Sequence, residues 1–225
     1  LSEIVEKNNL PISIAYVMRQ HPALQAMKHA LDSERFGRAV QIVYTGGQHF
    51  PFYRPAYRET YYTRHDTGGG AIQDALTHTI NAAEWLVGPV TKLVADAEHC
   101  VLEGVDVEDT VHVITRHRSV LGSFSLNQHQ PANESTLTVL CERGAVRYEG
   151  HNARWLSCVE PDSNWNVEEE FPLERDDLFV SQARAFLSQL AGEAEAACTL
   201  AEGLQTLRVN LAALESVDTE SWKHI

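Results

Sequence analysis

An aspartate and a histidine, Asp74 and His78, lie four residues apart in a segment whose residues favour a helix. On a helix this spacing places both side chains on one face, with Cβ atoms about 5–6 Å apart. A nearby carboxylate raises the proton affinity of an imidazole and can orient its ring, which suits proton transfer to or from a substrate hydroxyl. The pair therefore predicts acid–base chemistry, with His78 and Asp74 as the candidate catalytic residues.

Two other interpretations of this pair remain open from spacing alone. A solvent-exposed Asp–His pair on an amphipathic helix would have the same separation. A metal site would need further ligands, and the eleven histidines include no H-x-H or H-E-x-x-H pattern, so no metal is predicted.

The helix that carries the pair is expected over residues 71–87, between a triple glycine at 68–70 and Gly88-Pro89. Glycine and proline directly after a helical pattern are typical of a helix end. Apolar residues at helical spacing form a separate stripe, which would pack on a sheet while the pair points elsewhere. The stripe consists of Ile72, Leu76, Ile80, Ala83 and Val87.

The segment before this helix, residues 46–67, is long, rich in aromatic and basic side chains, and has little regular pattern. A loop of this length in a compact protein is usually functional or disordered, and the aromatic content argues against disorder. Arginine and tyrosine offer directed hydrogen-bond donors to hydroxyl or carboxylate groups. Arg54, Tyr57 and Arg58 are therefore candidate substrate-binding residues, although the same side chains could simply pack the loop onto the sheet.

The rest of the chain indicates one large sheet with several helices. Residues 11–18 have the pattern of a short buried strand, 22–33 that of a helix opened by Pro22, and 39–44 that of a second strand. Two helices, 176–191 and 200–215, close the chain, the second with a possible Thr199/Glu202 capping box. This order predicts an α+β fold with a large, open, mostly antiparallel sheet and helices on one face. Seven further strands are expected at 90–99, 108–117, 120–129, 135–142, 145–149, 153–159 and 165–171.

Charge and composition argue against some partners. The net charge of −13 and the scattered Lys and Arg residues do not suit a nucleic-acid-binding surface. No apolar run reaches 18 residues, so no membrane span is expected. The four cysteines form no C-x-x-C pair and lie in apolar or alternating segments, which favours small buried thiols and a cytoplasmic protein.

Beyond these local patterns, the chain resembles the Gfo/Idh/MocA family, which includes glucose–fructose oxidoreductase and inositol dehydrogenase. The family's Asp-x-x-x-His helix follows a glycine-rich turn and ends in Leu-x-Gly-Pro-Val, which here is residues 86–90. Residues 16–22, Tyr-Val-Met-Arg-Gln-His-Pro, resemble the stretch where the family's chain leaves its nucleotide-binding domain. Residues 174–216 resemble the family's closing helices, so the resemblance covers essentially the whole chain.

The resemblance implies an NAD- or NADP-dependent dehydrogenase or reductase that transfers hydride between the nicotinamide and a sugar or polyol carbon. It implies that His78 is the catalytic acid/base and that Asp74 binds a substrate hydroxyl. It also places Arg19 near the nicotinamide or the substrate, and Tyr16 on the cofactor side. We further expect a homodimer or homotetramer that forms through the open sheet.

Compared with the family, the sequence shows only the end of a dinucleotide-binding domain. No G-x-G-x-x-G turn is present, and Leu1-Ser2 looks like the continuation of the Glu-Lys-Pro motif that supplies a catalytic lysine in the family. Residues 1–33 would be the last Rossmann strand and linking helix, and 34–225 the substrate-binding and oligomerisation domain. The cofactor would then be bound mainly by an upstream domain, and this chain alone would be inactive. The alternative is a non-catalytic sugar-sensing or dimerisation module of the same fold.

Overall fold

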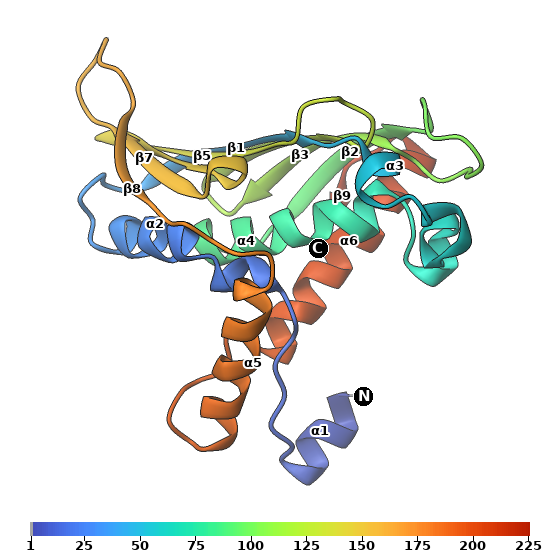
Figure 1. The fold of residues 1–225 in the computed structure, drawn as a ribbon, viewed down its shortest axis with the longest axis horizontal. Coiled ribbons are helices and arrows are strands. Elements are labelled where there is room, and N and C mark those ends of the chain that lie inside the picture. The colour runs from blue at the N-terminus through green and yellow to red at the C-terminus, as the bar shows by residue number, and fades with distance from the viewer. Residues whose placement is uncertain (1) are drawn as a thin grey trace.

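A nine-stranded sheet forms the centre of the computed structural model, which describes residues 2–225 (Figure 1). The strands lie in the order β8-β7-β6-β5-β1-β4-β3-β2-β9 across the sheet. Strands β1 and β4 run parallel, whereas the other neighbouring pairs of the described sheet are antiparallel. The predicted α+β class with a large, mostly antiparallel sheet is thus confirmed. The strands are β1 Ala39–Gly47, β2 Lys92–Glu98, β3 Thr110–His117, β4 Val120–Asn127, β5 Glu134–Cys141, β6 Gly144–Glu149, β7 Arg154–Cys158, β8 Asn166–Glu170 and β9 Lys223–His224.

Alternation of apolar and polar residues decides which face of the sheet is buried. In β3, Val111 and Val113 are buried, whereas His112 and Ile114 are exposed. Val113 pairs across the strands with Phe124 of β4, so two buried apolar side chains meet on the same face. Because successive side chains point to opposite faces, the sheet has one packed face and one open face.

Three helices, α2, α4 and α6, pack along the packed face of the sheet (Figure 1). Helices α1 and α5 project away from the sheet, and we call these two helices the arm (Figure 1). The predicted capping box is present, since the Thr199 hydroxyl accepts the Glu202 amide and the Glu202 carboxylate accepts the Thr199 amide. The helices are α1 Ser2–Asn8, α2 Pro22–Asp32, α3 Phe50–Tyr53, α4 Thr77–Val87, α5 Asp177–Leu190 and α6 Leu200–Thr219.

The main core lies between these helices and the sheet. The predicted apolar stripe enters it, because Ile72, Leu76 and Ile80 are each only 1% exposed. They join Ile42 and Phe124 from the middle of the sheet. Burying one such side chain contributes about 1.5–3 kcal/mol, so the stripe fixes the helix against the sheet.

Residues 11–18 form no strand, contrary to the prediction. They run extended and then enter a 3₁₀ helix at Val17–Gln20. The Ile14 amide donates to the Cys198 carbonyl, yet no strand of the described chain lies beside this segment. An apolar, β-branched run needs a neighbouring strand before its backbone can form a ladder. Helix α1, which the sequence patterns do not indicate, precedes the extended stretch.

The cysteines agree only in part with the expectation of small buried thiols. All four cysteines are free thiols, but only Cys198 is buried; Cys141 and Cys158 are partly buried, and Cys100 is exposed. The prediction of a buried thiol is wrong for Cys100 because it lies in the loop after β2 rather than in a strand. No helix within residues 2–225 is both long and apolar enough to cross a membrane.

Residues 50–67, which we call the aromatic segment, fold into short helical turns around a small core of their own. Tyr57 and Tyr62 are nearly fully buried there, at 2% and 1% exposure. Loop residues that follow β2 complete this core. Its members are Phe50, Tyr57, Tyr62, Leu102, Val105 and Val107.

Candidate active site

The start of the Asp74/His78 helix is shaped by Glu108. The backbone carbonyl of Glu108 accepts the Ala71 amide at 2.9 Å, and its carboxylate accepts the Ile72 amide at 2.8 Å. Both bonds satisfy amides that a helix N-terminus leaves without partners. The first turn, Ile72–Leu76, is a π-helical turn, which is wider than an α-helical turn and is frequent at functional sites.

Replacement of Gly70 by alanine is expected to destabilise the protein by about 2–4 kcal/mol. Gly70 has a φ of +90°, and a Cβ at this position would overlap the Glu108 carboxylate. Gly68→Ala is the matched control, because Gly68 has a similar φ of +91° but open space around a Cβ, so backbone strain of about 1–2 kcal/mol is its only cost. Urea unfolding of both variants measures the difference. Equal losses would show that the carboxylate contact adds nothing.

A cleft of about 980 Å³ opens beside Asp74 and His78. It lies between the helix, the aromatic segment and the ends of β1 and β5. Aromatic rings with hydroxyl groups can cover the apolar face of a polar ligand and still bond to its hydroxyls. Five tyrosines contribute to the lining, namely Tyr44, Tyr53, Tyr57, Tyr61 and Tyr62.

His78 lies largely buried at this cleft. Burial lowers the pKa of His78, and the nearby Asp74 charge offsets this only in part. The buried Nδ1 atom has no hydrogen-bond partner among the described residues, and the Tyr16 ring lies edge-on to the imidazole at 5.7 Å between centroids. The imidazole is therefore neutral near pH 7 and can act as a proton acceptor.

Asp74 shares the cleft with His78, but no hydrogen bond joins the two side chains in the described structure. Instead, the Tyr61 hydroxyl donates to Asp74 Oδ1 at 2.5 Å. This hydrogen bond, together with burial and the carboxylate charge, raises the pKa of Tyr61 to about 12. Asp74 and His78 thus lie near each other, as predicted. The Asp74 carboxylate does not bond to the His78 ring, so it does not orient the ring as predicted.

Two of the three candidates in the aromatic segment, Arg54 and Tyr57, line the cleft. The Tyr57 hydroxyl already donates a hydrogen bond within the protein, to the Glu103 carbonyl at 2.7 Å. The third candidate, Arg58, lies outside the lining. Its Nε donates to the same Glu103 carbonyl and its guanidinium pairs with the Glu103 carboxylate at 3.5 Å, so the loop after β2 holds it.

Arg19, the predicted substrate- or cofactor-side arginine, also lies outside the lining of this cleft. It is only 4% exposed, its Nε donates to Asn81 at 2.8 Å, and its Nη1 donates to Glu202 at 2.7 Å. Its role is therefore to join α4 to α6. Tyr16 stays next to the candidate base, because its hydroxyl shares a 3.1 Å hydrogen bond with Thr77 while its ring meets His78.

Tyr61, whose hydroxyl bonds to the candidate carboxylate, is not among the residues predicted from the sequence. Tyr61 and Tyr62 are adjacent, and one is 57% exposed at the cleft while the other is buried in the small core. No pattern in the sequence distinguishes them, because the segment has no regular periodicity. The carboxylate of Glu134, at the start of β5, also lines the cleft and lacks a sequence signal.

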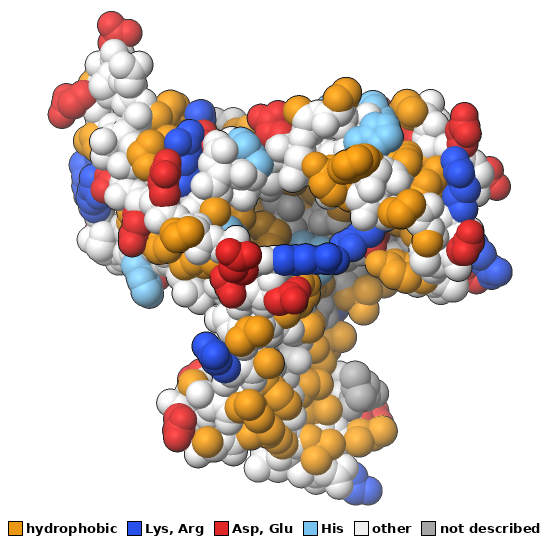
Figure 2. All heavy atoms as spheres, viewed as in Figure 1, with side chains coloured by type: hydrophobic (Ala, Val, Ile, Leu, Met, Phe, Trp, Pro, Cys, Tyr) orange, Lys and Arg blue, Asp and Glu red, His pale blue; other side chains and the backbone are white. Residues whose placement is uncertain are grey.

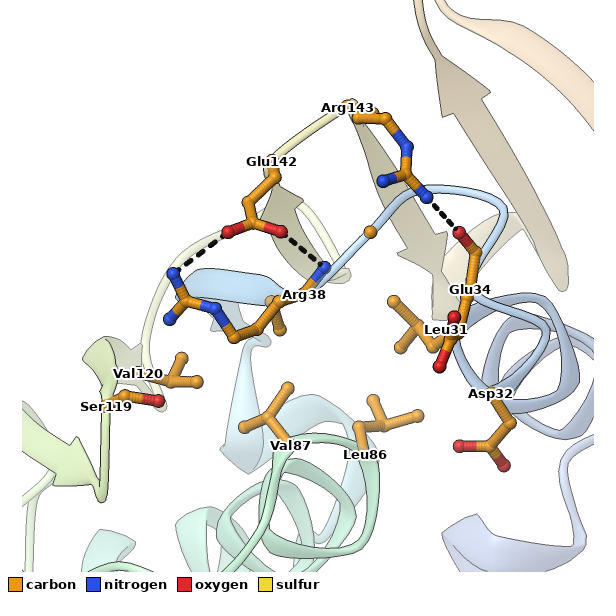
Figure 3. Close-up of a pocket in the computed structure, with 12 residues that line it drawn as sticks. Leu31, Asp32, Glu34, Arg38, Leu86, Val87, Ser119, Val120, Glu142 and Arg143 are labelled. Atoms are coloured by element: carbon orange, nitrogen blue, oxygen red, sulfur yellow. Dashed lines mark hydrogen bonds and ion pairs between the residues drawn. The ribbon is translucent and has the colours of Figure 1, made fainter.

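A second hollow, of about 600 Å³, lies at the other end of α4 (Figure 3). Its arginines are already bonded, since Arg38 donates to the Glu142 carboxylate at 2.9 Å and Arg143 donates to the Glu34 carbonyl at 2.6 Å. Its lining contains no histidine. The cleft beside His78 is therefore the better candidate for acid–base chemistry. Within residues 2–225, no cluster of three or more His, Cys, Asp or Glu side chains could hold a metal ion.

Comparison with known proteins identifies the family. A family model described as the GFO/IDH/MocA C-terminal domain matches residues 24–147, which is more than half of the 225-residue chain. The chain belongs to the GFO/IDH/MocA family. The resemblance drawn from the sequence motifs is thus confirmed. A search of curated protein sequences finds no significant match.

Solved structures share the fold of this GFO/IDH/MocA chain. Levoglucosan dehydrogenase in complex with NADH and levoglucosan has a TM-score of 0.86 at 20% identity, with 99% of this chain and 68% of that chain covered. The WlbA dehydrogenase from Bordetella pertussis, in complex with NADH and UDP-GlcNAcA, has a TM-score of 0.81 at 22% identity, with 100% and 67% covered. An NAD binding oxidoreductase from Klebsiella pneumoniae has a TM-score of 0.85 at 17% identity, with 100% and 69% covered. The chain thus spans about two thirds of the length of these proteins.

Proposed function

We propose that the full-length protein is an NAD- or NADP-dependent oxidoreductase that acts on a sugar, a polyol or a related hydroxy compound. The observation that carries the proposal is the buried, neutral imidazole of His78 beside the Asp74 carboxylate in a tyrosine-lined cleft. Membership of the GFO/IDH/MocA family and the NADH-bound dehydrogenases among its structural neighbours support it.

In the direction of oxidation, His78 takes the proton of the substrate hydroxyl. Its Nδ1 is buried without a partner, which leaves Nε2 as the nitrogen with access to the cleft. Asp74 accepts a hydrogen bond from a substrate hydroxyl and so fixes the reacting carbon beside the imidazole. When bound, the nicotinamide supplies the hydride acceptor or donor.

The residues present fit the nicotinamide end of the cofactor. Ala15 and Val17 line the same cleft as His78, and Tyr16 between them contacts the imidazole. These residues would meet the nicotinamide, while the phosphates would be held by an upstream domain.

The arm supports an upstream nucleotide-binding domain. Its helices carry large apolar side chains on the surface, and Figure 2 shows them gathered over the arm. Phe179 and Leu187 of α5 are 62% and 63% exposed, and Ile4 of α1 is 58% exposed. An apolar patch of this kind marks a surface that another part of the protein covers.

The assay that tests the function uses the full-length protein with NAD and NADP against a panel of sugars and polyols, with absorbance at 340 nm as the readout. Oxidation of at least one panel member is expected. Asp74→Asn should raise KM for that substrate by about 10-fold or more, because the amide is a weaker acceptor than the carboxylate. Sugar binding by calorimetry without any turnover would instead favour a non-catalytic sensing module.

The open face of the sheet supports a homodimer or homotetramer. Neighbouring strands expose apolar side chains on it, including Ile114 at 50% and Leu121 at 42% exposure. Ile114→Glu is expected to weaken self-association at least about 10-fold, because it buries an unpaired charge in the interface. Light scattering after gel filtration measures the change. Val101→Glu, at an exposed loop position, is the control, and an unchanged oligomer in Ile114→Glu would place the interface elsewhere.

A further inference from the structure

The aromatic segment holds Tyr61 at the cleft in a fixed position. Its neighbour Tyr62 is 1% exposed in the small core, which anchors this point of the chain. The Thr67 hydroxyl donates to the Tyr61 carbonyl at 2.6 Å, and Gln73 from the helix donates to the His65 carbonyl at 2.9 Å. The position of Tyr61 over the helix is therefore set by packing and by hydrogen bonds on both sides of it.

Asp74 has two possible partners and bonds to only one of them. Its Oδ1 accepts the Tyr61 hydroxyl at 2.5 Å. His78 lies one helical turn further on, close enough for the carboxylate charge to affect the imidazole, yet its Nδ1 remains without a hydrogen bond. A buried polar atom without a partner costs free energy, yet the Asp74 carboxylate one turn away bonds to Tyr61 and not to this atom.

We propose that Tyr61 is a positioning residue that holds the Asp74 carboxylate away from the His78 imidazole. Two consequences follow for the reaction. The second carboxylate oxygen stays available for a substrate hydroxyl, and the imidazole stays unpaired and neutral, ready to accept a proton. The catalytic meaning of this arrangement rests on the proposed function, but the arrangement itself can be tested without turnover.

The surroundings of His78 favour Asp74 as its partner once Tyr61 is removed. The phenol of Tyr16 meets the ring by its edge and is bonded to Thr77. The other charged or titratable groups that line the cleft are Tyr44 from β1, Tyr53, Arg54, Tyr57, Tyr61 and Tyr62 from the aromatic segment, Asp74 on the same helix and Glu134 from β5. Asp74 is the group among them whose charge acts on the imidazole. A carboxylate released by Tyr61 would pair with the imidazolium and stabilise it.

The test is a titration of His78 by NMR in the full-length protein with ring-labelled histidine, with the signal assigned by His78→Gln. Tyr61→Phe removes only the hydroxyl that bonds to Asp74. Tyr53→Phe is the matched control, because Tyr53 lines the same cleft and its hydroxyl makes no hydrogen bond within residues 2–225. The double variant Tyr61→Phe/Asp74→Asn removes the carboxylate charge as well.

The midpoint of the His78 titration should move to higher pH in Tyr61→Phe, stay unchanged in Tyr53→Phe, and fail to rise in the double variant. An active enzyme should also show a loss in kcat/KM of about 10-fold at neutral pH in Tyr61→Phe. A folded Tyr61→Phe protein with an unchanged His78 midpoint would overturn the proposal. A rise that persists in the double variant would also overturn it, because the carboxylate would not be the cause. Neither result depends on whether the protein turns over a sugar.

Discussion

Alanine in place of His78 is expected to lower kcat of the full-length enzyme by about 10²–10⁴-fold and to leave the fold intact. The imidazole is the buried proton acceptor at the cleft, and no second histidine lines that cleft among the described residues. Steady-state kinetics on the substrate found in the panel assay, with circular dichroism of both proteins, measures the effect.

The pH dependence gives this prediction a second readout. A base must be deprotonated to work, so kcat/KM for oxidation should fall as the pH is lowered through the pKa of His78. Burial lowers that pKa, so the fall should come below the ordinary histidine value of 6.5. His29→Ala, at an exposed position on α2, is the control and should keep both the rate and this acid limb. Unchanged turnover in His78→Ala would refute the assignment.

Methionine in place of Arg19 is expected to destabilise the protein by about 2–4 kcal/mol, mainly because two buried or partly buried acceptors lose their donor. The buried guanidinium bonds to Asn81 on α4, to Glu202 on α6 and to the Ala197 carbonyl at 3.0 Å. Methionine fills much of the volume but leaves all three acceptors without their donor. Urea unfolding measures the loss.

Arg58→Met is the matched control for Arg19→Met. Arg58 is 49% exposed and pairs with a carboxylate that is 89% exposed, so its loss should cost less than about 1 kcal/mol. Comparing the two variants also shows whether Arg19 stabilises the fold or contacts the substrate. An Arg19→Met protein of normal stability but raised KM would restore Arg19 to the substrate site.

Strands β1 to β8 could be predicted closely because each carries its own signal, whereas β9 was not expected and the strand predicted at 11–18 does not form. The range 108–117 differs from β3, Thr110–His117, by two residues, since apolar and polar positions alternate along it. The capping box at α6 is likewise a local pattern. The parallel pairing of β1 with β4 has no local signal, because the two strands are joined through the aromatic segment, the Asp74/His78 helix and two further strands.

The site could be predicted only in part. Spacing identified Asp74 and His78 as cleft neighbours, but it could not show that the partner of Asp74 is Tyr61, thirteen residues earlier in an irregular segment. The π-helical turn that carries Asp74 also departs from the regular helix on which the spacing argument depends. Arg19 and Arg58 lie outside the cleft lining and bond to protein acceptors, and the sequence cannot distinguish such an arginine from one that binds a ligand.

The small core beneath the aromatic segment has a consequence for how such a protein can acquire new specificity. Its six apolar residues belong to no other buried cluster, and a few hydrogen bonds join the segment to its surroundings, among them Gln73 to the His65 carbonyl and the Phe50 amide to the Gln128 carbonyl. Evolution or protein engineering could replace residues 50–67 and 102–107 together and so change the aromatic segment that lines the cleft. The catalytic helix would keep its packing on the sheet, whereas the hydrogen bonds of Gln73 and Gln128 with the segment would have to be made again by the new sequence.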